Sequence, residues 1–191
     1  MKVVAINGSA RKEGNTARLI GTVLQELEKE SIETEVVNLS GKEIRGCTAC
    51  MKCWKNKDAR CAAHKDFLNK CLEKMTHADG IILGSPTYFA NVSTEMKALI
   101  DRAGMVGLAN DFLYRRKVGA GVVAVRRGGA IHVFNSLNHF FFINQMVVPG
   151  SIYWNMGTGL EKGEVEKDEE GLKTMQVLGE NMAWLLKKLN A

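Results

Sequence analysis

The 191-residue sequence predicts an α/β fold, a doubly wound five-stranded parallel sheet with helices on both faces, built as one domain of residues 1–191. Three observations predict this fold. Apolar stretches of strand length alternate with stretches of helical periodicity along the chain. One of the strand-length stretches, at residues 80–84, is apolar throughout, as in sheets that are covered on both faces. No internal repeat divides the chain, and its length suits a single hydrophobic core.

Five segments have the composition of strands. The first, residues 2–6, ends at an Asn-Gly turn signal, and the second, residues 32–39, alternates apolar and polar side chains. The third, "GIILG" at residues 80–84, is apolar on both faces, and the fourth is "VGAGVVAV" at residues 118–125. The short apolar segment at residues 146–152 is the expected fifth strand.

Apolar side chains recur at helical spacing between these strands and in the C-terminal tail. The expected helices span residues 15–29, 67–75, 93–103, 130–145 and about 167–189. Helical crossovers of one hand place them on both faces of a parallel sheet. Ligands of such sheets bind beyond the carboxyl ends of the strands, so the loops after the first, third and fourth strands are the expected site.

Composition and charge argue against several classes of partner. Hydrophobic residues make up 46% of the chain and charged residues 25%, which is typical of soluble globular proteins. No apolar run approaches the roughly 18 residues of a membrane helix, so no membrane partner is expected. The net charge of +5 comes from cations scattered among acidic residues, so no nucleic-acid partner is expected either. The apolar stretch at residues 3–6 is too short for a signal peptide, which favours a cytoplasmic location.

The loop after the first strand, "NGSARKEGNTARLI", brings hydroxyl groups and a cation to the start of a helix. Its glycine spacing fits neither the dinucleotide fingerprint nor the nucleoside-triphosphate loop. Free N–H groups at the helix start, together with Ser9, Arg11, Asn15 and Thr16, suit a single terminal phosphate. The alternative is an ordinary N-cap at Asn15 or Thr16.

This loop resembles the phosphate loop of the flavodoxin-like, NADPH-dependent FMN reductase family, which binds the ribityl phosphate of FMN. The segment "GSPTYFANVSTEMKALIDR" is similar to the flavin loop of that family. The resemblance implies that five of its residues line the isoalloxazine ring: Pro86, Thr87, Tyr88, Phe89 and Asn91. Exposed aromatic rings beside a backbone turn also suit flavin stacking on physical grounds, with core packing of Tyr88 and Phe89 as the alternative.

The third loop, "VRRGGAIHVFN", stands where the family has a small, glycine-rich turn. Gly128 and Gly129 match that turn, whereas Arg126 and Arg127 depart from it. Flavin contact is expected at Arg127 and Gly128, because a guanidinium beside the ring would stabilise an anionic reduced flavin. The alternative is that both arginines are solvated.

Four cysteines lie close together in "GCTACMKCWKNKDARC", namely Cys47, Cys50, Cys53 and Cys61. A reducing compartment and an odd total of five cysteines argue against disulfides. The spacing C-x2-C-x2-C-x7-C resembles the compact motif of the iron–sulfur flavoproteins, in which four cysteines hold a 4Fe-4S cluster near FMN. Three closely spaced thiolates can wrap one corner of a cubane while the fourth folds back to the remaining iron. A zinc site, or free redox-active thiols with the cluster lost or absent, are the alternatives.

The remaining potential ligands show no such spacing. Cys71 lies on the apolar stripe of the following helix and is expected to be a small buried hydrophobe. The histidines are expected at the surface or at helix ends: His64, His77, His132 and His139.

Together these features predict an oxidoreductase, an FMN- and 4Fe-4S-containing electron-transfer flavoprotein without an obligatory catalytic side chain. The resemblance implies a ferredoxin-type electron carrier as partner, with an unknown acceptor. One alternative is an NAD(P)H-dependent FMN or quinone reductase without a cluster, in which NAD(P)H is the electron donor. The other is a non-enzymatic thiol or zinc sensor on the same scaffold.

Three consecutive phenylalanines, Phe140 to Phe142, lie in the fourth expected helix. One helix face cannot bury all three against a single sheet, so some of these aromatic side chains are expected at the surface. A partner subunit would cover such a surface. A homodimer or tetramer is therefore expected, with an interface that includes residues 134–156 and the flavin loops. The alternative is a monomer with these aromatics under the C-terminal segment.

Overall fold

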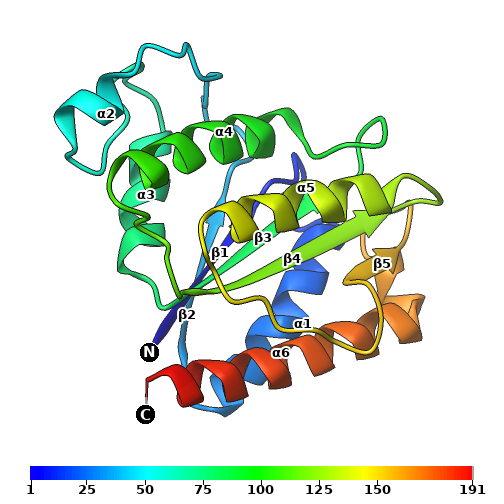
Figure 1. The fold of residues 1–191 in the computed structure, drawn as a ribbon. Helices are drawn as coiled ribbons and strands as arrows, with labels where there is room; N and C mark the ends of the chain where they lie inside the picture. The colour runs from blue at the N-terminus through cyan, green and yellow to red at the C-terminus, as the bar shows by residue number, and fades with distance from the viewer. Residues whose placement is uncertain (191) are drawn as a thin grey trace.

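The computed structural model describes residues 1–190 and contains one five-stranded sheet with helices on both faces (Figure 1). The strands are β1 (Lys2–Asn7), β2 (Glu33–Asn38), β3 (Gly80–Pro86), β4 (Val118–Val125) and β5 (Met156–Thr158). All neighbouring strands are parallel, in the order β2-β1-β3-β4-β5. The predicted doubly wound α/β fold, which is that of the flavodoxin-like proteins, is therefore confirmed.

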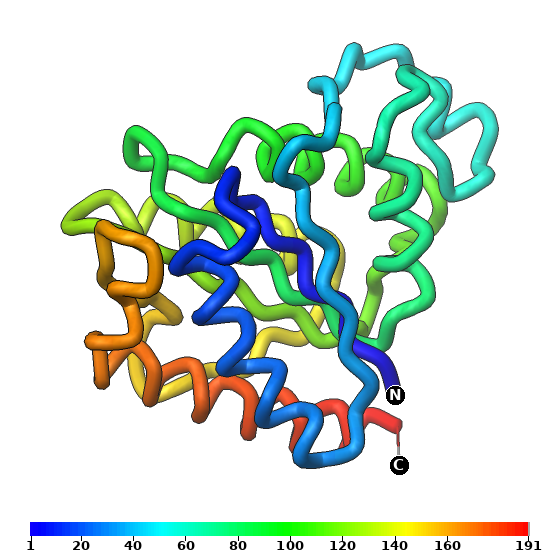
Figure 2. Tube along the Cα trace, turned by 180° about the vertical axis from the view of Figure 1, so that it is seen from behind, coloured from blue at the N-terminus to red at the C-terminus, as the bar shows by residue number. Residues whose placement is uncertain are grey.

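Six α-helices and one 3-10 helix surround the sheet: α1 (Asn15–Lys29), α2 (Lys52–Asn56), α3 (Leu68–His77), α4 (Thr94–Ala109), α5 (Ala130–Ile143), η1 (Glu164–Lys167) and α6 (Glu169–Leu189). The helices α1 and α6 lie side by side on one face of the sheet, and α3, α4 and α5 cover the other face (Figures 1 and 2). Helix α2 was not predicted; it lies in the cysteine segment, outside both layers. Within residues 1–190, no helix is both long and apolar enough to cross a membrane.

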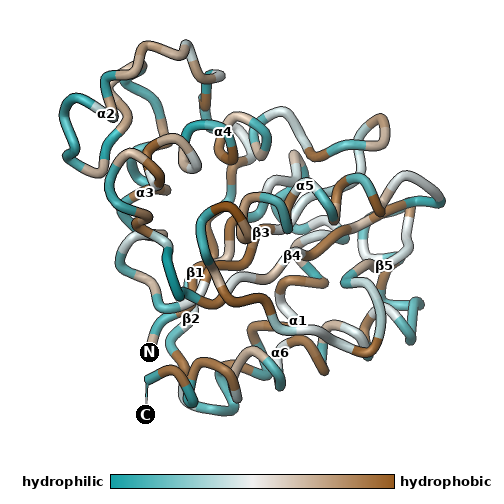
Figure 3. The backbone as a smooth tube through the Cα atoms, in the orientation of Figure 1, coloured by the Kyte–Doolittle hydropathy of each residue, from teal (hydrophilic) through white to brown (hydrophobic). Residues whose placement is uncertain are grey.

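The core consists of two apolar clusters, one on each face of the sheet, and Figure 3 shows hydrophobic colour concentrated along the strands. Successive side chains of β1 alternate between the two clusters. Val3 and Ala5 pack toward α1 and α6, whereas Val4 and Ile6 pack toward the opposite helices. Full burial of each such Val or Ile contributes roughly 1.5–3 kcal/mol, which explains why the strands read as apolar throughout.

The expected fifth strand at residues 146–152 is wrong. Val147 pairs with the start of β4, because its N–H donates to the Lys117 carbonyl at 3.0 Å and its carbonyl accepts from Gly119 at 2.9 Å. Pro149 has no N–H to continue this ladder, and the chain leaves the sheet there. The chain returns as β5, which pairs with the end of β4 instead.

This correction changes which segments meet at the carboxyl edge of the sheet. The Gly159 N–H, just after β5, donates to the Val125 carbonyl at 2.9 Å. The Thr87 N–H donates to the Ala124 carbonyl at 2.8 Å, and the Gly8 N–H to the Gly84 carbonyl at 2.8 Å. The loops after β1, β3, β4 and β5 are therefore joined by backbone hydrogen bonds at the switch point between β1 and β3.

Candidate functional site: a pocket at the sheet edge and a cysteine loop

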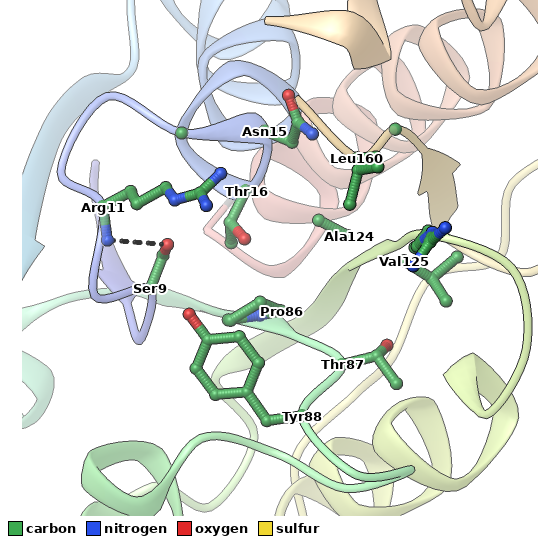
Figure 4. Close-up of a pocket in the computed structure, with 13 residues that line it drawn as sticks. Ser9, Arg11, Asn15, Thr16, Pro86, Thr87, Tyr88, Ala124, Val125 and Leu160 are labelled. Atoms are coloured by element: carbon green, nitrogen blue, oxygen red, sulfur yellow. Dashed lines mark hydrogen bonds between the residues drawn. The ribbon is translucent and has the colours of Figure 1, made fainter. Parts of the chain in front are cut away.

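A pocket of about 300 Å³ lies at the carboxyl ends of β1, β3 and β4 (Figure 4). It is lined by Ser9, Arg11, Gly14, Asn15, Thr16, Pro86, Thr87, Tyr88, Ala124, Val125, Arg126, Gly159 and Leu160. Seven of the predicted site residues are in this set, and they come from the loop after β1 with the start of α1 and from the end of β3 with the loop that follows it. Each of these loops is positioned by a strand that is buried on both faces, so the lining is held by rigid elements.

The loop after β1 forms one end of the pocket. Ser9 is buried, and its Oγ accepts a hydrogen bond from the Arg11 N–H at 3.1 Å. The guanidinium of Arg11 extends along the pocket wall toward Thr16 (Figure 4). A Cβ atom at Gly14 would lie 3.0 Å from the Arg11 Cβ and 3.2 Å from its carbonyl oxygen, so any larger residue would crowd this turn.

Two hydroxyl groups of the pocket lack a partner. The Thr16 Oγ1 and Thr87 Oγ1 atoms are buried and make no hydrogen bond with any of the residues that the structure describes. A buried hydroxyl without a partner costs roughly 1–3 kcal/mol. Both side chains line the pocket, so a ligand with acceptor oxygens would satisfy them. The residues present therefore fit a flavin that carries a phosphate, with Thr16 at a helix start where anions bind.

Asn15 has a structural partner in the opposite loop. Its Oδ1 accepts hydrogen bonds from the N–H groups of Gly163, at 2.9 Å, and Val165, at 3.5 Å. The N-cap of α1 is Gly14, and no side chain within residues 1–190 caps this helix end. The alternative interpretation of Asn15 or Thr16 as the N-cap is therefore wrong.

The loop after β3 forms the other end of the pocket. Tyr88 and Asn91 exchange backbone hydrogen bonds at 2.9 and 3.0 Å, which closes a tight turn. Tyr88 lies beside Pro86 with its hydroxyl directed toward Ser9 (Figure 4). The turn points Phe89 fully into solvent, and the Asn91 Oδ1 accepts from the Val92 N–H at 2.8 Å. Neither Phe89 nor Asn91 lines the pocket.

The loops after β4 and β5 complete the wall with residues that were not predicted. Arg126 lines the pocket, whereas Arg127 lines only a neighbouring cavity of about 410 Å³, and Gly128 lines neither. Gly159 and Leu160 reach the pocket because they directly follow β5. The sequence signal for Gly159 and Leu160 is the Gly-x-Gly motif at the end of β5. It was missed because the fifth strand was expected at residues 146–152.

The cysteine segment lies over α3 and α4, apart from the sheet (Figure 1). Its four cysteines line one small cavity, of about 20 Å³, together with Arg102 of α4. Cys47 and Cys50 are exposed, whereas Cys53 and Cys61 are half-buried against the core. All five cysteines of the described chain are free thiols.

The backbone of this segment is held in an unusual conformation. Four non-glycine residues have positive φ angles: Ala49 at 51°, Met51 at 56°, Lys57 at 49° and Ala59 at 57°. Such conformations cost energy and persist only where the surroundings enforce them. Hydrogen bonds from the Lys52 N–H and Thr48 lower the pKa of the Cys50 thiol, while burial raises that of Cys53.

The four thiols line one cavity without converging on a single point. Within residues 1–190, no group of three or more Cys, His, Asp or Glu side chains is placed to hold one metal ion. In a cubane each thiolate binds a different iron atom, so the four sulfurs need to surround a volume and need not converge on one point. The four thiols around one cavity supply the number and kind of donors that a cubane requires, and the cavity itself has a volume of about 20 Å³.

Comparison with known proteins identifies the family. Residues 1–161 match the sequence model of the NADPH-dependent FMN reductase family. The chain belongs to this family. An iron-sulfur flavoprotein of Methanocaldococcus jannaschii is 38% identical over 194 residues, which cover 98% of each chain. An iron-sulfur flavoprotein of Methanosarcina thermophila is 33% identical over 183 residues, which cover 92% of this chain and 90% of the relative.

A solved structure of RosB with a bound 8-demethyl-8-formylriboflavin-5'-phosphate intermediate has the same fold, with a TM-score of 0.77. It is 22% identical in sequence and the match covers 100% of this chain and 80% of RosB. The chain is thus a flavin-dependent oxidoreductase of this family, and the two relatives above carry the name of the iron–sulfur flavoproteins, which the resemblance predicted.

Neither Cys71 nor any of the four histidines lines the flavin pocket or the cysteine cavity. Cys71 is buried in the core, as predicted, and burial raises its pKa to about 12. His77, His132 and His139 are exposed. The His64 Nε2 lies 3.2 Å from the Gly46 carbonyl oxygen, which joins the two ends of the cysteine segment.

The aromatic segment after β4 is divided between core and surface. Phe140 and Phe141 are buried, whereas Phe142 is 61% exposed, which confirms that one helix face cannot bury all three. Tyr153 and Trp154 are also exposed and line a groove of about 580 Å³ together with Phe142.

Proposed function

We propose that this chain is an electron-transfer flavoprotein that binds FMN in the pocket at the sheet edge and a 4Fe-4S cluster at Cys47, Cys50, Cys53 and Cys61. It would pass electrons between a one-electron carrier such as ferredoxin and an acceptor that the residues do not identify. The observation that carries the proposal is that one chain presents two separate sets of cofactor donors. Buried hydroxyls without partners line the pocket, and four free thiols line the cavity on α4.

The phosphate of FMN would bind at the start of α1. Thr16 Oγ1 would donate its hydroxyl hydrogen to a phosphate oxygen, and so would Ser9, whose Oγ already accepts from Arg11 and keeps its hydrogen free. The Arg11 guanidinium supplies the opposite charge. Backbone N–H groups of the first helical turn add further donors.

The ring of the flavin would lie along the loop after β3. Pro86 and Tyr88 offer apolar surface to the ring. The Thr87 hydroxyl, which has no partner, would hydrogen-bond to the polar edge of the ring. Arg126 lines the pocket, so it replaces Arg127 as the candidate guanidinium beside the ring. Phe89, Asn91, Arg127 and Gly128 remain candidates only if a partner subunit or a ligand moves these loops.

The two cofactors divide the chemistry, because FMN exchanges electrons singly or as a hydride while a cubane cluster carries one electron at a time. The protein needs no acid or base for this exchange. Its side chains bind the two groups, keep water from them and set how strongly each accepts electrons. NAD(P)H as donor is compatible with the same pocket, because a hydride donor stacks on the flavin ring.

A homodimer or tetramer belongs to this proposal. The cysteine cavity contacts α4 at Arg102 and Met105, while the loop after β3 leads into the start of that helix at Thr94. The nine helical residues from Thr94 to Arg102 span roughly 14 Å. The flavin pocket and the cysteine cavity of one chain therefore lie well apart. A second subunit that covers Phe142, Tyr153 and Trp154 would bring its own cysteine segment toward the flavin pocket of its neighbour.

Iron, sulfide, zinc and FMN analysis of anaerobically purified protein tests the proposal. We expect about four irons and four sulfides per chain, with FMN bound. Cys50→Ala should lose the iron and keep FMN, because the flavin pocket contains no part of the cysteine segment. The matched control Cys71→Ala removes a buried thiol outside the motif and should keep both. Normal iron in Cys50→Ala, or an iron-free wild type, would contradict the proposal.

A second candidate is an NAD(P)H-dependent FMN or quinone reductase without a cluster. The small volume of the cysteine cavity, about 20 Å³, favours it. A solved NAD(P)H:quinone oxidoreductase from Methanothermobacter marburgensis shares the fold, with a TM-score of 0.68 and 13% identity. In that case the wild type would contain FMN without iron and would oxidise NAD(P)H. A zinc sensor is the weakest alternative, because the described chain has no group of three or more Cys, His, Asp or Glu side chains placed to hold one ion.

A further inference from the structure

Arg102 is a buried cation at the cysteine loop. It lies in α4, its side chain is 0% exposed, and it lines the same cavity as the four cysteines. Removing a guanidinium from water costs several kcal/mol unless hydrogen bonds and an opposite charge compensate. A chain that buries one here therefore has to provide partners for it.

The guanidinium of Arg102 has hydrogen-bond partners on two sides. Its Nε and Nη2 atoms both lie 3.3 Å from the Cys61 Sγ, so the two parallel N–H groups that usually hold a carboxylate converge on one sulfur. Its Nη1 donates to the Asp66 Oδ2 at 2.5 Å and to the Arg45 carbonyl at 3.0 Å. The Asp66 side chain is 2% exposed, so this ion pair is buried on both sides.

The backbone of Cys61 is held by a side chain as well. The Asn69 Oδ1 accepts from the Cys61 N–H at 2.9 Å, and the Asn69 Nδ2 donates to the Cys61 carbonyl at 3.0 Å. Its backbone and its sulfur are therefore both placed by neighbouring side chains. Cys47 and Cys50, in contrast, are exposed.

We propose that Arg102 is a positioning residue that holds the Cys61 sulfur for the cluster and, through its buried positive charge, raises the reduction potential of that cluster. This inference rests on the proposed function. Reduction adds one electron, and so one negative charge, without forming or breaking a bond. A buried cation and two N–H···S hydrogen bonds stabilise the added charge, because hydrogen bonds to the sulfurs and local charge set cluster potentials. Asp66 opposes this effect and keeps the guanidinium in place.

Potentiometric titration of the anaerobic holoprotein with dithionite as reductant, followed by electron paramagnetic resonance, tests the proposal. Arg102→Met removes the positive charge and should shift the cluster midpoint to a more negative potential. Asp66→Asn removes the negative charge and should shift it to a more positive one. Arg102→Lys keeps the positive charge but lacks the two parallel N–H groups of the guanidinium. Its midpoint potential should therefore lie between those of the wild type and Arg102→Met. The control Arg18→Met removes an exposed guanidinium of α1 that is paired with Glu166, on the other face of the sheet, and should leave the midpoint unchanged.

The opposite signs separate this role from a purely structural one. Arg102→Met and Asp66→Asn break the same buried ion pair, so loss of stability would affect both in the same way. Unchanged midpoints in the Arg102 and Asp66 variants, or shifts of the same sign, would overturn the proposal. If Arg102→Met does not incorporate iron, the contrast between Arg102→Lys and Asp66→Asn decides. Wild-type protein without iron and sulfide would instead refute the proposed function.

Discussion

Thr16 allows a test in which the two expected effects have opposite directions. The residue is 1% exposed, and its hydroxyl makes no hydrogen bond with residues 1–190. Thr16→Val keeps the shape of the side chain and replaces this hydroxyl with a methyl group. Because the lone hydroxyl costs roughly 1–3 kcal/mol, the flavin-free variant should be at least as stable as the flavin-free wild type.

Binding of FMN should respond in the other direction. A hydrogen bond to a charged group is worth roughly 1.5–3 kcal/mol, so its loss should weaken FMN binding by about 10- to 150-fold. Riboflavin has no phosphate, so its affinity should stay the same. Flavin fluorescence quenching gives both dissociation constants, and urea unfolding of the flavin-free protein gives its stability.

Thr22→Val is the matched control for this experiment. Thr22 lies in the same helix, where its Oγ1 donates to the Arg18 carbonyl at 3.2 Å on the outer side. This control should change neither flavin affinity. An equal loss of FMN and riboflavin affinity in Thr16→Val would refute the assignment of the phosphate to the start of α1, and a marked loss of stability in the flavin-free variant would show that the hydroxyl already has a partner.

Two further predictions concern assembly and pH. Phe142→Glu places a charge on the exposed aromatic surface and should shift the protein toward monomer in light scattering at micromolar concentration; a monomeric wild type with bound FMN would contradict the proposed assembly. Burial raises the pKa of Asp66, but hydrogen bonds from Arg102 and the Arg45 N–H outweigh this and lower it below its ordinary value. The ion pair therefore stabilises the fold fully above about pH 4, and this contribution is lost as pH falls through the lowered pKa. The wild type should exceed Asp66→Asn by about 3–5 kcal/mol in free energy of unfolding near neutral pH, and a gap that does not narrow in acid would contradict this.

The local patterns of the sequence were sufficient for the fold class. The alternation in β1 and the doubly apolar β3 depend only on which side chains must be buried, and the structure buries them as expected. The fifth strand was misplaced, because residues 146–152 have strand composition but pair with β4 only at Val147 before Pro149 ends the ladder. Strand pairing depends on partners far along the chain, which local composition does not specify.

The candidate sites show the same division. Spacing within one loop was enough to single out Ser9, Arg11, Thr16 and the four cysteines, because residues that bind one group from a single loop must be close in sequence.

Contacts between distant segments were decided by the tertiary structure alone. Gly159 and Leu160 enter the pocket only through the pairing of β5, and the turn after β4 presents Arg126 rather than Arg127. Arg102 and Cys61 are 41 residues apart, and the sequence around each of them does not indicate that they are in contact. They meet because α4 packs beneath the cysteine loop, and that packing follows from burial of whole helix faces, which no local spacing in the sequence records.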